Sequence, residues 1–476
     1  MLGLYGLLNL GARSLQTQRQ GVEVAGQNMA NVNNPAYARQ RLKLSSAPTI
    51  AGENGLQGTG VQSDGVEQLR NSMLDMQIVS EASVRGALES RQSGLQLAQA
   101  NLGQLIDRQA SGPEGAAAAS GVGGEQNISK GLSDLFSALQ SLSTDPSSMT
   151  QRNLVLMKAA DLASRFTQTN QRLDGLSDNL DQSLAADVSK TNQLLSDIAK
   201  LNDQISNAEI STSGMASDLR DTREAKIEEL AKLTTITVTN ASGADVGISI
   251  GGVQMVQGKN LLDTLETYDA GGGQMLVRTV TGAAPLSITG GSMNGTIQAR
   301  DEDVKGMQDS LNTLAANLIT QLNTIHQTGY SLTGSNNNLF FSGSNAADIS
   351  VNAALTANPA LIQASGTSGA SGNNGVVVQM AQLETKSITA LGGLTLSGKF
   401  AQITATVGQS LSSVNGHLTD QTVVDHMLLK QRDSYSGVSL DEEMTDLTRF
   451  QKAFSASAKL ITTVDEMLDT VIGMKR

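Results

Sequence analysis

The chain has 476 residues, of which 39% are hydrophobic and 3% aromatic, with no Trp and no Cys. This length allows about three domains, and the scarcity of aromatic residues favours helix packing through aliphatic side chains. The net charge of −12 argues against a nucleic-acid partner, and the absence of Cys excludes disulfides and thiolate metal sites. No segment approaches the roughly 20 apolar residues of a membrane span.

The start of the chain carries apolar side chains at heptad spacing, which predicts an amphipathic α-helix. A second heptad row includes the small residues Gly11 and Ala25, which allow a partner helix to approach closely. The Asn-rich segment 31–35, which ends in proline, terminates the helix. The apolar segment 2–10 lacks a basic n-region and a cleavage site, so we interpret it as helix and not as a signal peptide. The first row is Leu8, Leu15, Val22 and Met29.

The next part of the chain predicts an extended segment followed by a series of helices. We expect extended structure over 37–62, a helix over 65–107, a Gly/Ala/Ser loop over 111–124 and a short helix over 128–142. Asp145 and Pro146 are typical of a helix start. A very long helix follows, with apolar residues in register from Leu173 to Ile205. Gly175 is a candidate position for a break in this helix. A shorter helix is expected over 218–233.

The composition changes at Thr234, where β-propensity and turn residues replace the helical pattern. Strands are predicted at 235–239, 246–250, 253–256, 275–280 and 286–288. Helix resumes from Arg300, and the Gly/Asn/Ser-rich segment 331–375 is interpreted as loop. Two further helices are expected over 401–418 and 422–432. The middle of the chain therefore predicts a small β-domain inserted in a helical protein.

The end of the chain predicts one long amphipathic helix whose apolar residues again follow a heptad. Ser439 and Glu442 match a capping box at its start. This helix is acidic, whereas the N-terminal helix is mainly basic, so we expect the two ends to pair as a coiled coil. The C-terminal seam is Leu440, Leu447, Phe450, Phe454, Ile461, Val464 and Leu468.

These elements predict a mainly α fold with an inserted small β-domain, paired terminal coiled-coil helices and a body of long helices. The expected domains are nested. Residues 1–35 and 436–476 form a terminal coiled-coil domain, residues 36–233 and 299–435 a helical body, and residues 234–298 the inserted β-domain. An elongated subunit of this kind suits stacking into a tube.

The segment 25–40 resembles the rod and hook signature of the flagellar axial protein family. Ala36 stands where that family usually has Gly. The segments 436–444, 450–459 and 463–468 are similar to the proteins that join hook and filament, and the similarity extends over most of the chain. The residues that carry the signature are Asn28, Asn31, Asn33, Pro35, Tyr37, Arg39 and Gln40.

This resemblance implies a fold and a role. The terminal helices would form the inner tube, followed outward by a helical second domain and a β third domain. The subunit would form a ring between hook and filament of an extracellular bacterial flagellum, after unfolded export through the type III pathway. The implied partners are copies of itself, the flagellar hook protein, a second junction protein (hook-associated protein 3) and a cytoplasmic export chaperone on the C-terminal helix.

Residues that could carry catalysis or bind a ligand have simpler explanations. The segment 393–400 nearly matches a phosphate-binding loop, but Phe400 replaces the Ser or Thr that would hold magnesium. The three histidines have no metal-ligand spacing, and the acids at 301–303 are typical of a first helical turn. We predict no catalytic, cofactor or metal site and no enzyme. Two alternatives remain: a hook or rod protein, or a secreted hydrolase or adhesin with its activity in the β-insertion.

Overall fold

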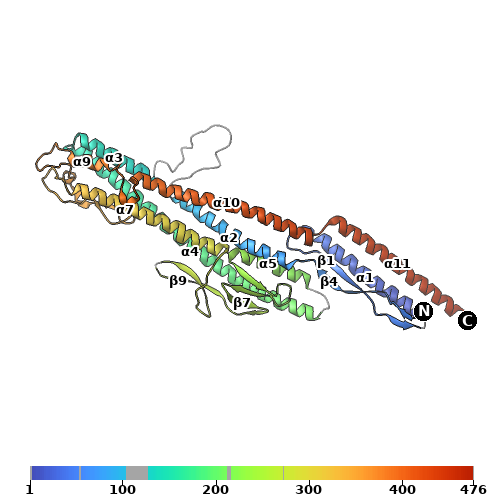
Figure 1. Ribbon diagram of the computed structural model, residues 1–476. Helices are drawn as coiled ribbons and strands as arrows, with labels where there is room; N and C mark the ends of the chain where they lie inside the picture. The colour runs from blue at the N-terminus through green and yellow to red at the C-terminus, as the bar shows by residue number, and fades with distance from the viewer. Residues whose placement is uncertain (1–2, 53–54, 103–126, 212–215, 272, 475–476) are drawn as a thin grey trace, which may run out of the picture.

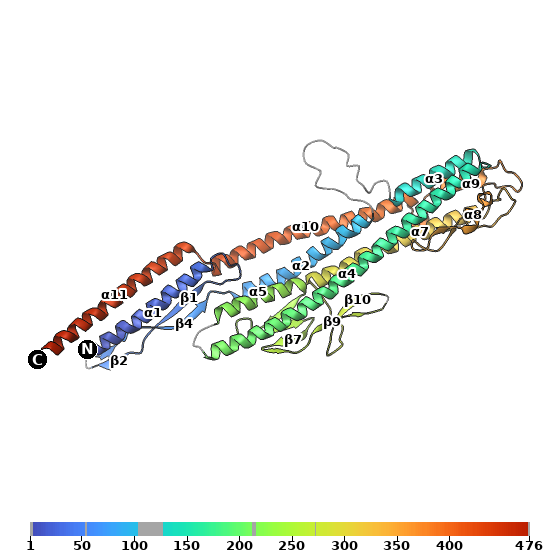
Figure 2. The same cartoon turned by 180° about the vertical axis from the view of Figure 1, so that it is seen from behind.

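The computed structural model describes residues 3–52, 55–102, 127–211, 216–271 and 273–474. The molecule is elongated, with both chain ends at one end and the loops of residues 331–375 at the other (Figure 1). A long helical body connects the two ends, and the inserted strands lie along one side of it (Figure 2). The prediction of a mainly helical fold with small sheets and paired terminal helices is confirmed.

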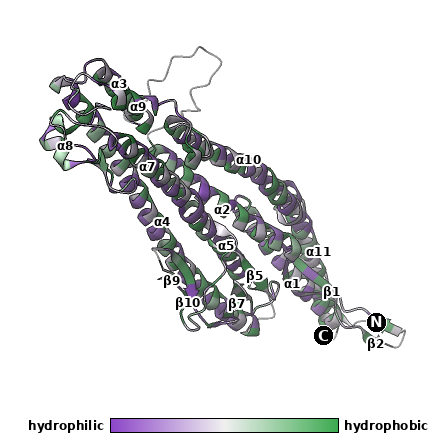
Figure 3. Ribbon diagram, turned by 60° about the vertical axis from the view of Figure 1, so that its left-hand side comes forward, coloured by the Kyte–Doolittle hydropathy of each residue, from purple (hydrophilic) through white to green (hydrophobic). Residues whose placement is uncertain are grey.

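The helical body contains elements from both halves of the sequence. Its two longest helices, α4 and α10, run along most of its length (Figure 1). Hydrophobic and hydrophilic residues alternate along these helices (Figure 3), and no helix among the described residues is apolar enough over its length to cross a membrane. The body elements are α2 Ser72–Asn101, α3 Ile128–Thr144, α4 Met149–Ser211, α5 Ser217–Leu233, α6 Gly291–Gln298, the π-helix η2 Ala299–Val304, α7 Lys305–His326, α8 Ala353–Ala357, α9 Gly375–Gln382 and α10 Leu396–Ser436.

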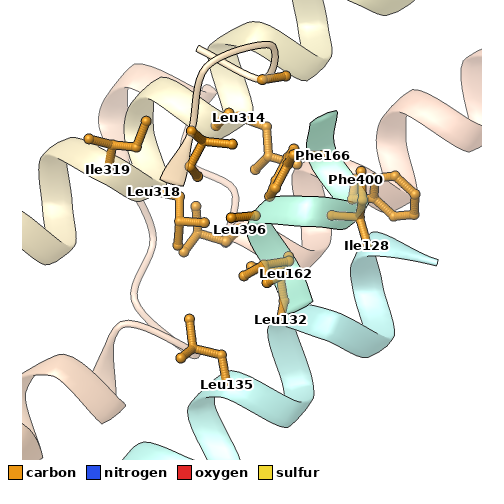
Figure 4. Close-up of a cluster of buried hydrophobic side chains, with 14 of the residues drawn as sticks. Ile128, Leu132, Leu135, Leu162, Phe166, Leu314, Leu318, Ile319, Leu396 and Phe400 are labelled. Atoms are coloured by element: carbon orange, nitrogen blue, oxygen red, sulfur yellow. The ribbon is translucent and has the colours of Figure 1, made fainter. Parts of the chain in front are cut away.

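The main hydrophobic core lies where α3, α4, α7 and the start of α10 meet (Figure 4). Its members are mostly aliphatic, as the composition predicts, and the few phenylalanines of the chain are concentrated there. Close packing of such side chains stabilises a fold by about 1.5–3 kcal/mol for each fully buried residue. Residues buried in this core include Leu132, Leu135, Phe166, Leu314, Leu318, Phe340, Phe341 and Phe400.

Several predicted helix boundaries are wrong. The helix expected from residue 65 begins at Ser72, because a strand continues to Gln68 and the Asn71 side chain caps the helix by accepting from the Met73 and Leu74 amides. The helix after Pro146 begins only at Met149. The predicted loop over 111–124 lies outside the described residues. In both wrong boundaries, residues that the sequence pattern assigns to the first turn of a helix belong to the preceding strand or turn.

Two predicted interruptions are absent from the long helices. Helix α4 runs without a break through Gly175, whose neighbours Leu173 and Leu176 are buried and hold the helix against the core. The two helices predicted at 401–418 and 422–432 are one helix, α10, of 41 residues. Packing along the whole length overrides the weak helix propensity of single Gly and Thr residues.

The inserted strands form a sheet that packs against the C-terminal part of α4. Leu195 and Ile198 of α4 and Ile248 and Val256 of the sheet belong to one buried cluster. The sheet order is β5-β6-β7-β8, and β9 pairs with β10. The bounds are β5 Ile236–Thr239, β6 Gly247–Ile250, β7 Val253–Gln257, β8 Asn260–Leu261, β9 Leu265–Asp269 and β10 Met275–Thr279.

The end of the insertion differs from the sequence prediction. Residues 286–288 form no strand, and helix resumes at Gly291 and not at Arg300. Gly291 has φ of +75°, and a Cβ on Gly295 would lie 2.1 Å from the Ala87 carbonyl oxygen. Gly295 therefore allows close packing of α6 on α2. Gly291, where a Cβ would lie 2.2 Å from the Thr234 amide nitrogen, allows the start of α6 to pack on the end of α5.

The distal segment 331–375 is more structured than the predicted loop. It contains β11 Phe341–Ser342, β12 Ser350–Val351, α8 and the 3₁₀ turn η3 Pro359–Leu361. Asn323 of α7 accepts from the Phe340 and Phe341 amides at 2.8 and 2.9 Å and donates to the Phe341 carbonyl at 2.9 Å. The Asn323 side chain thus supplies the hydrogen bonds that these buried backbone groups would otherwise make within a regular sheet.

The distal end is also held by the buried guanidinium of Arg152. It donates to the carbonyl oxygens of Pro146, Pro359 and Ile362 at 2.9, 3.3 and 2.7 Å, and burial lowers its pKa to about 10. Arg152→Met should lower the free energy of unfolding by about 2–4 kcal/mol, because three buried carbonyls lose their donor. Thermal unfolding checks this, with the exposed Arg172→Met as control. Equal melting temperatures for both variants would contradict it.

Candidate assembly site

The two terminal helices lie side by side. Helix α1 spans Leu4–Ala30 and α11 spans Leu440–Gly473, and they run antiparallel (Figure 1). A Cβ on Gly11 would lie 2.7 Å from Ile461 Cγ1, and one on Gly21 would lie 2.6 Å from Phe450 Cδ1. Both glycines are therefore required for the observed helix separation, because any larger residue would force a large side chain aside.

The predicted seam residues occupy two faces of the helix pair. On α1, Leu8, Leu15, Val22 and Met29 are half-buried. The buried positions of α1 are Gly11, Thr17, Gly21, Val24, Ala25 and Asn28. On α11, Val464 is buried, and Leu447, Phe450, Ile461 and Leu468 are half-buried. Leu440 and Phe454 remain 48% and 39% exposed. The heptad therefore covers the face toward α1 and a neighbouring face that points to solvent.

A polar side chain, Asn28, organises the point where the terminal pair joins the body. Its Oδ1 accepts from the Tyr37 hydroxyl at 2.8 Å and from the Gln40 amide at 2.9 Å. Its Nδ2 donates to the Gln40 carbonyl at 2.8 Å and to Glu443 Oε2 at 3.0 Å. All donors and acceptors of this amide are used, which makes Asn at this position hard to replace.

Charged groups reinforce the contact between Asn28 and α11. Arg39 Nε donates to Glu443 Oε1 at 2.7 Å and its Nη1 to Glu442 at 2.5 Å, while the Arg39 amide donates to the Ser436 carbonyl at 2.8 Å. Burial lowers the pKa of Arg39, but Glu443 and Glu442 outweigh it, so the pKa lies above its ordinary value. The predicted capping box is wrong: the Ser439 side chain caps nothing, and the acids of this turn bind Arg39.

The same segment is fixed to the body through Asp221 of α5. Its carboxylate accepts from the Ala38 amide at 3.2 Å, from Gln68 Nε2 at 3.0 Å and from Arg70 Nη2 at 2.7 Å. Arg70 also donates to the Ala36 carbonyl at 3.0 Å. Residues 36–40 therefore connect α1, α11 and α5, and we call this set of contacts the joint.

The other signature residues form the turn beside the joint. Asn33 and Pro35 are exposed and Asn31 is half-buried, and together with Tyr435 and Ser439 they line a cleft of about 600 Å³. The cleft lies between the turn after α1 and residues 432–439 at the end of α10. Sequence reasoning missed Asp221, Arg70 and Glu443 as partners of the signature, although Glu443 lies within the similar segment 436–444.

Comparisons with known proteins give the same picture. A family model described as "Flagellar hook-associated protein FlgK helical domain" matches residues 121–341, and one described as "Flagellar basal body rod FlgEFG protein C-terminal" matches residues 430–474. Flagellar hook-associated protein 1 of Bacillus subtilis (strain 168) is 25% identical over 98% of this chain and 97% of its own. The protein of the same name from Salmonella typhimurium is 22% identical over 98% of this chain and its whole length. The chain belongs to the flagellar hook-associated protein 1 family.

A solved structure adds the fold of the hook-associated protein 1 family. The flagellar hook junction protein FlgK from Burkholderia pseudomallei has a TM-score of 0.61 and 14% identity, and the match covers 76% of this chain and all of that one. A flagellar hook protein of Treponema pallidum is similar over only 22% of this chain, at 33% identity. The full-length matches therefore favour the hook-associated protein 1 family over the alternative of a hook protein.

The remaining sequence candidates are structural in this member of the hook-associated protein 1 family. Phe400 of the near phosphate-loop is buried in the core as part of α10. His326 is buried between the Asn338 carbonyl and the Gln363 amide, and burial lowers its pKa to about 4. Asp301 and Asp303 pair with Arg300 and Arg91. Among the described residues, no cluster of three His, Asp or Glu could hold a metal ion.

A buried carboxyl group beside the joint should make stability depend on pH. Glu224 of α5 lines a cleft of about 170 Å³ with Arg70 and Arg223, and burial, opposed by Arg70, raises its pKa to about 7. The folded protein favours the protonated form, so its free energy of unfolding should fall as pH rises from about 4.3 to about 7.

Glu224→Gln removes this titration and tests the effect. The variant should melt at a higher temperature than the native chain near pH 8 and near the native temperature at about pH 4.5. The exposed Glu384→Gln is the matched control and should follow the native curve. Parallel curves for Glu224→Gln and the native chain would show that folding does not shift the pKa of Glu224.

Proposed function

We propose that the chain is a structural subunit of the hook–filament junction of the bacterial flagellum and assembles through its terminal helices. Its membership of the hook-associated protein 1 family supports the location, and the relative from Burkholderia pseudomallei is itself described as a hook junction protein. The observation that carries the assembly mode is a line of exposed apolar side chains on α11. These residues, here called the α11 stripe, are Leu440, Met444, Phe454 and Ile472.

The α11 stripe has the properties of an unfilled interface. Its members are 48%, 59%, 39% and 66% exposed, and their spacing of 4, 10 and 18 residues keeps them on one face of a helix with 3.6 residues per turn. The adjacent face of α11 is already packed on α1 through Phe450, Ile461 and Val464. Exposed apolar residues that continue along a helix mark a protein interaction site, and a copy of the same chain is the occupant that we propose.

The joint gives such a subunit a defined shape. Asn28, Arg39 and Glu443 hold the α1–α11 pair to the body on one side, while the cleft lined by residues 31–35 and 432–439 leaves space on the other. A pair of terminal helices held at a fixed angle places every α11 stripe in the same orientation when copies assemble. Repeated identical contacts of this kind generate rings or tubes.

The proposed partners follow from the same surface. Before assembly, the α11 stripe would be exposed in the cytoplasm, so we propose that an export chaperone covers it there. After export, the subunit would contact copies of itself, the hook protein on one side and the second junction protein, hook-associated protein 3, on the other. We propose that residues 234–298 face away from the tube as a separate domain. Its last element, α6, attaches this domain to the helical body by packing against α2.

The location is tested on isolated flagella. Cells that lack the native gene are complemented with a chain tagged in the β-insertion, and purified hook–filament structures are labelled with antibody and imaged. We expect label at one narrow band where hook meets filament. Label along the whole filament, or filaments that form normally without any label, would contradict the proposal.

A further inference from the structure

We infer that the α11 stripe of one copy docks in a groove between α1 and the β2–β3 hairpin of the next copy. This inference rests on the proposed assembly through the terminal helices and names the surface that receives α11. The groove is about 310 Å³ in volume and is lined by Leu10 and Arg13 of α1 and by Pro48 and Ile50 of the hairpin. The strands are β1 Gln40–Ser46, β2 Ile50–Gly52, β3 Gly55–Gln57 and β4 Val61–Gln68.

The groove and the α11 stripe belong to different faces of the terminal domain. Gly11, Ser14 and Gly21 of α1 contact α11, whereas Leu10 and Arg13 line the groove on the side of the strands. Figure 1 shows α11 along one side of α1 and β1 and β4 along the other. A contact between two different patches of identical chains is heterologous, and such contacts generate rings or helical tubes and not closed pairs.

The apolar character of the groove matches the stripe. Ile50 is 56% exposed although it is a large β-branched residue on a short hairpin. Tyr5 is 76% exposed and lies one turn from Asn9, a lining residue, so it stands at the rim of the groove. Leu10, Pro48 and Ile50 make one part of the groove apolar, and its polar lining residues are Asn9, Arg13, Thr59 and Gln62. The convex apolar edge of another helix fits this apolar part.

Charge complementarity favours α11 as the occupant. The groove lining contains one cation, Arg13, and no acid. The last part of the α11 stripe carries Asp465 and Asp469, both exposed and spaced to share its face with Ile472. An apolar edge flanked by carboxylates therefore meets a partly apolar groove whose lining includes one guanidinium. Complementary charges of this kind fix register and suppress wrong pairings.

The positions of the two surfaces along the helix axis lie close together. Gly11 of α1 lies beside Ile461 of α11 and Gly21 beside Phe450, so residues 6–13 of the groove are level with the part of α11 around Asp465. Ile472 lies roughly 10 Å further along the axis. A neighbouring copy displaced by this distance would bring its groove to Ile472, and such a displacement suits a lateral contact in a helical ring.

Charge reversal tests the register of the contact in the full chain. Arg13→Glu alone and the double change Asp465→Lys/Asp469→Lys alone should each reduce the amount of chain in purified hook–filament structures on the order of tenfold. The two sets combined should restore most of it. Export into the medium is measured in parallel, so that loss of assembly is not confused with loss of secretion. A combination no better than either single set would overturn the inference.

Cross-linking supplies a second, independent measurement. The native chain has no Cys, so every thiol in a variant is an introduced one. Ile50→Cys/Ile472→Cys in assembled junctions should give a ladder of multimers with a short bis-maleimide. The matched control Ile50→Cys/Met157→Cys, whose second thiol replaces a 61% exposed Met of α4, should give monomer. A ladder in the control and none in the test pair would overturn the inference.

The outcomes also separate this inference from the proposed function. If Phe454→Asp prevents assembly while the Ile50–Ile472 pair does not cross-link, the terminal helices assemble the ring and the groove is not the receiving surface. If Phe454→Asp assembles normally and the pair does not cross-link, both proposals fail. A ladder together with rescue by charge reversal supports both.

Discussion

Asn28→Ala is expected to release the terminal helix pair from the body while the body itself stays folded. The change deletes four hydrogen bonds, to the Tyr37 hydroxyl, to both backbone groups of Gln40 and to Glu443. Each buried group left without a partner costs about 1–3 kcal/mol, so the joint should lose on the order of 4 kcal/mol. The main core, around Phe166 and Leu318, makes no use of this contact.

Hydrogen exchange and limited proteolysis can measure this release. Amides of residues 37–40 and of the first turns of α11 should exchange faster in Asn28→Ala, with unchanged protection in α3, α4 and α7. Asn31→Ala is the matched control, because the Asn31 side chain makes only an intrahelical hydrogen bond to the Gln27 carbonyl. If Asn28→Ala exchanges like Asn31→Ala, the joint is held by Arg39 and Asp221 without Asn28.

The joint explains why the signature residues occur together. Tyr37, Arg39 and Gln40 contribute different groups to one network with Asn28 and Glu443. Burial, followed by the charges of Asp218, Asp221 and Glu443, raises the pKa of the Tyr37 hydroxyl above its ordinary value, so it stays a donor. A resemblance to the axial proteins marked these residues, but it gave no partner for them. The partners lie on α5 and α11, far away in sequence, and local patterns carry no information about such contacts.

For the terminal helices too, the sequence pattern predicts the element but not its packing contacts. Heptad spacing predicted both helices and their pairing, because period depends on the chain alone. It did not predict that Leu440 and Phe454 stay partly exposed while Ile461 and Val464 are more deeply covered. Gly11 and Gly21 contribute to this difference, since the absence of a side chain there leaves room for Ile461 and Phe450 against α1. Which face of α11 is buried depends on the helix it packs against, α1, and not on the heptad spacing alone.

The body shows where propensity is overridden. The sequence analysis placed a helix boundary between residues 418 and 422, yet α10 continues because Val414, Gln421 and Leu428 are buried along its inner face. The inserted sheet was predicted in outline, with two short strands missed and one predicted in excess. Strands of two to five residues have little local signal, and the buried cluster with Leu195 and Ile198 of α4 stabilises them.

Phe454→Asp is expected to leave the monomer intact and to prevent formation of the junction. The side chain is 39% exposed in the monomer, so a carboxylate there stays hydrated, and exposed substitutions change stability by only about 0.5 kcal/mol. In the proposed ring a neighbour would cover the same position, where an unpaired ion costs several kcal/mol. The cost applies to every subunit, so assembly should fail while circular dichroism and melting of the monomer remain nearly native.

Two variants on the same helix separate this effect from others. Ala456→Asp adds the same charge at an exposed position on a different face and should support normal filaments. Ile461→Asp lies against Gly11, so it should also speed hydrogen exchange in α1, which Phe454→Asp should not. Filament number, and flagellin lost to the medium, report assembly in cells that lack the native gene. Normal filaments with Phe454→Asp would mean that α11 has no neighbour on this face, and the α11 stripe would then not be the assembly surface.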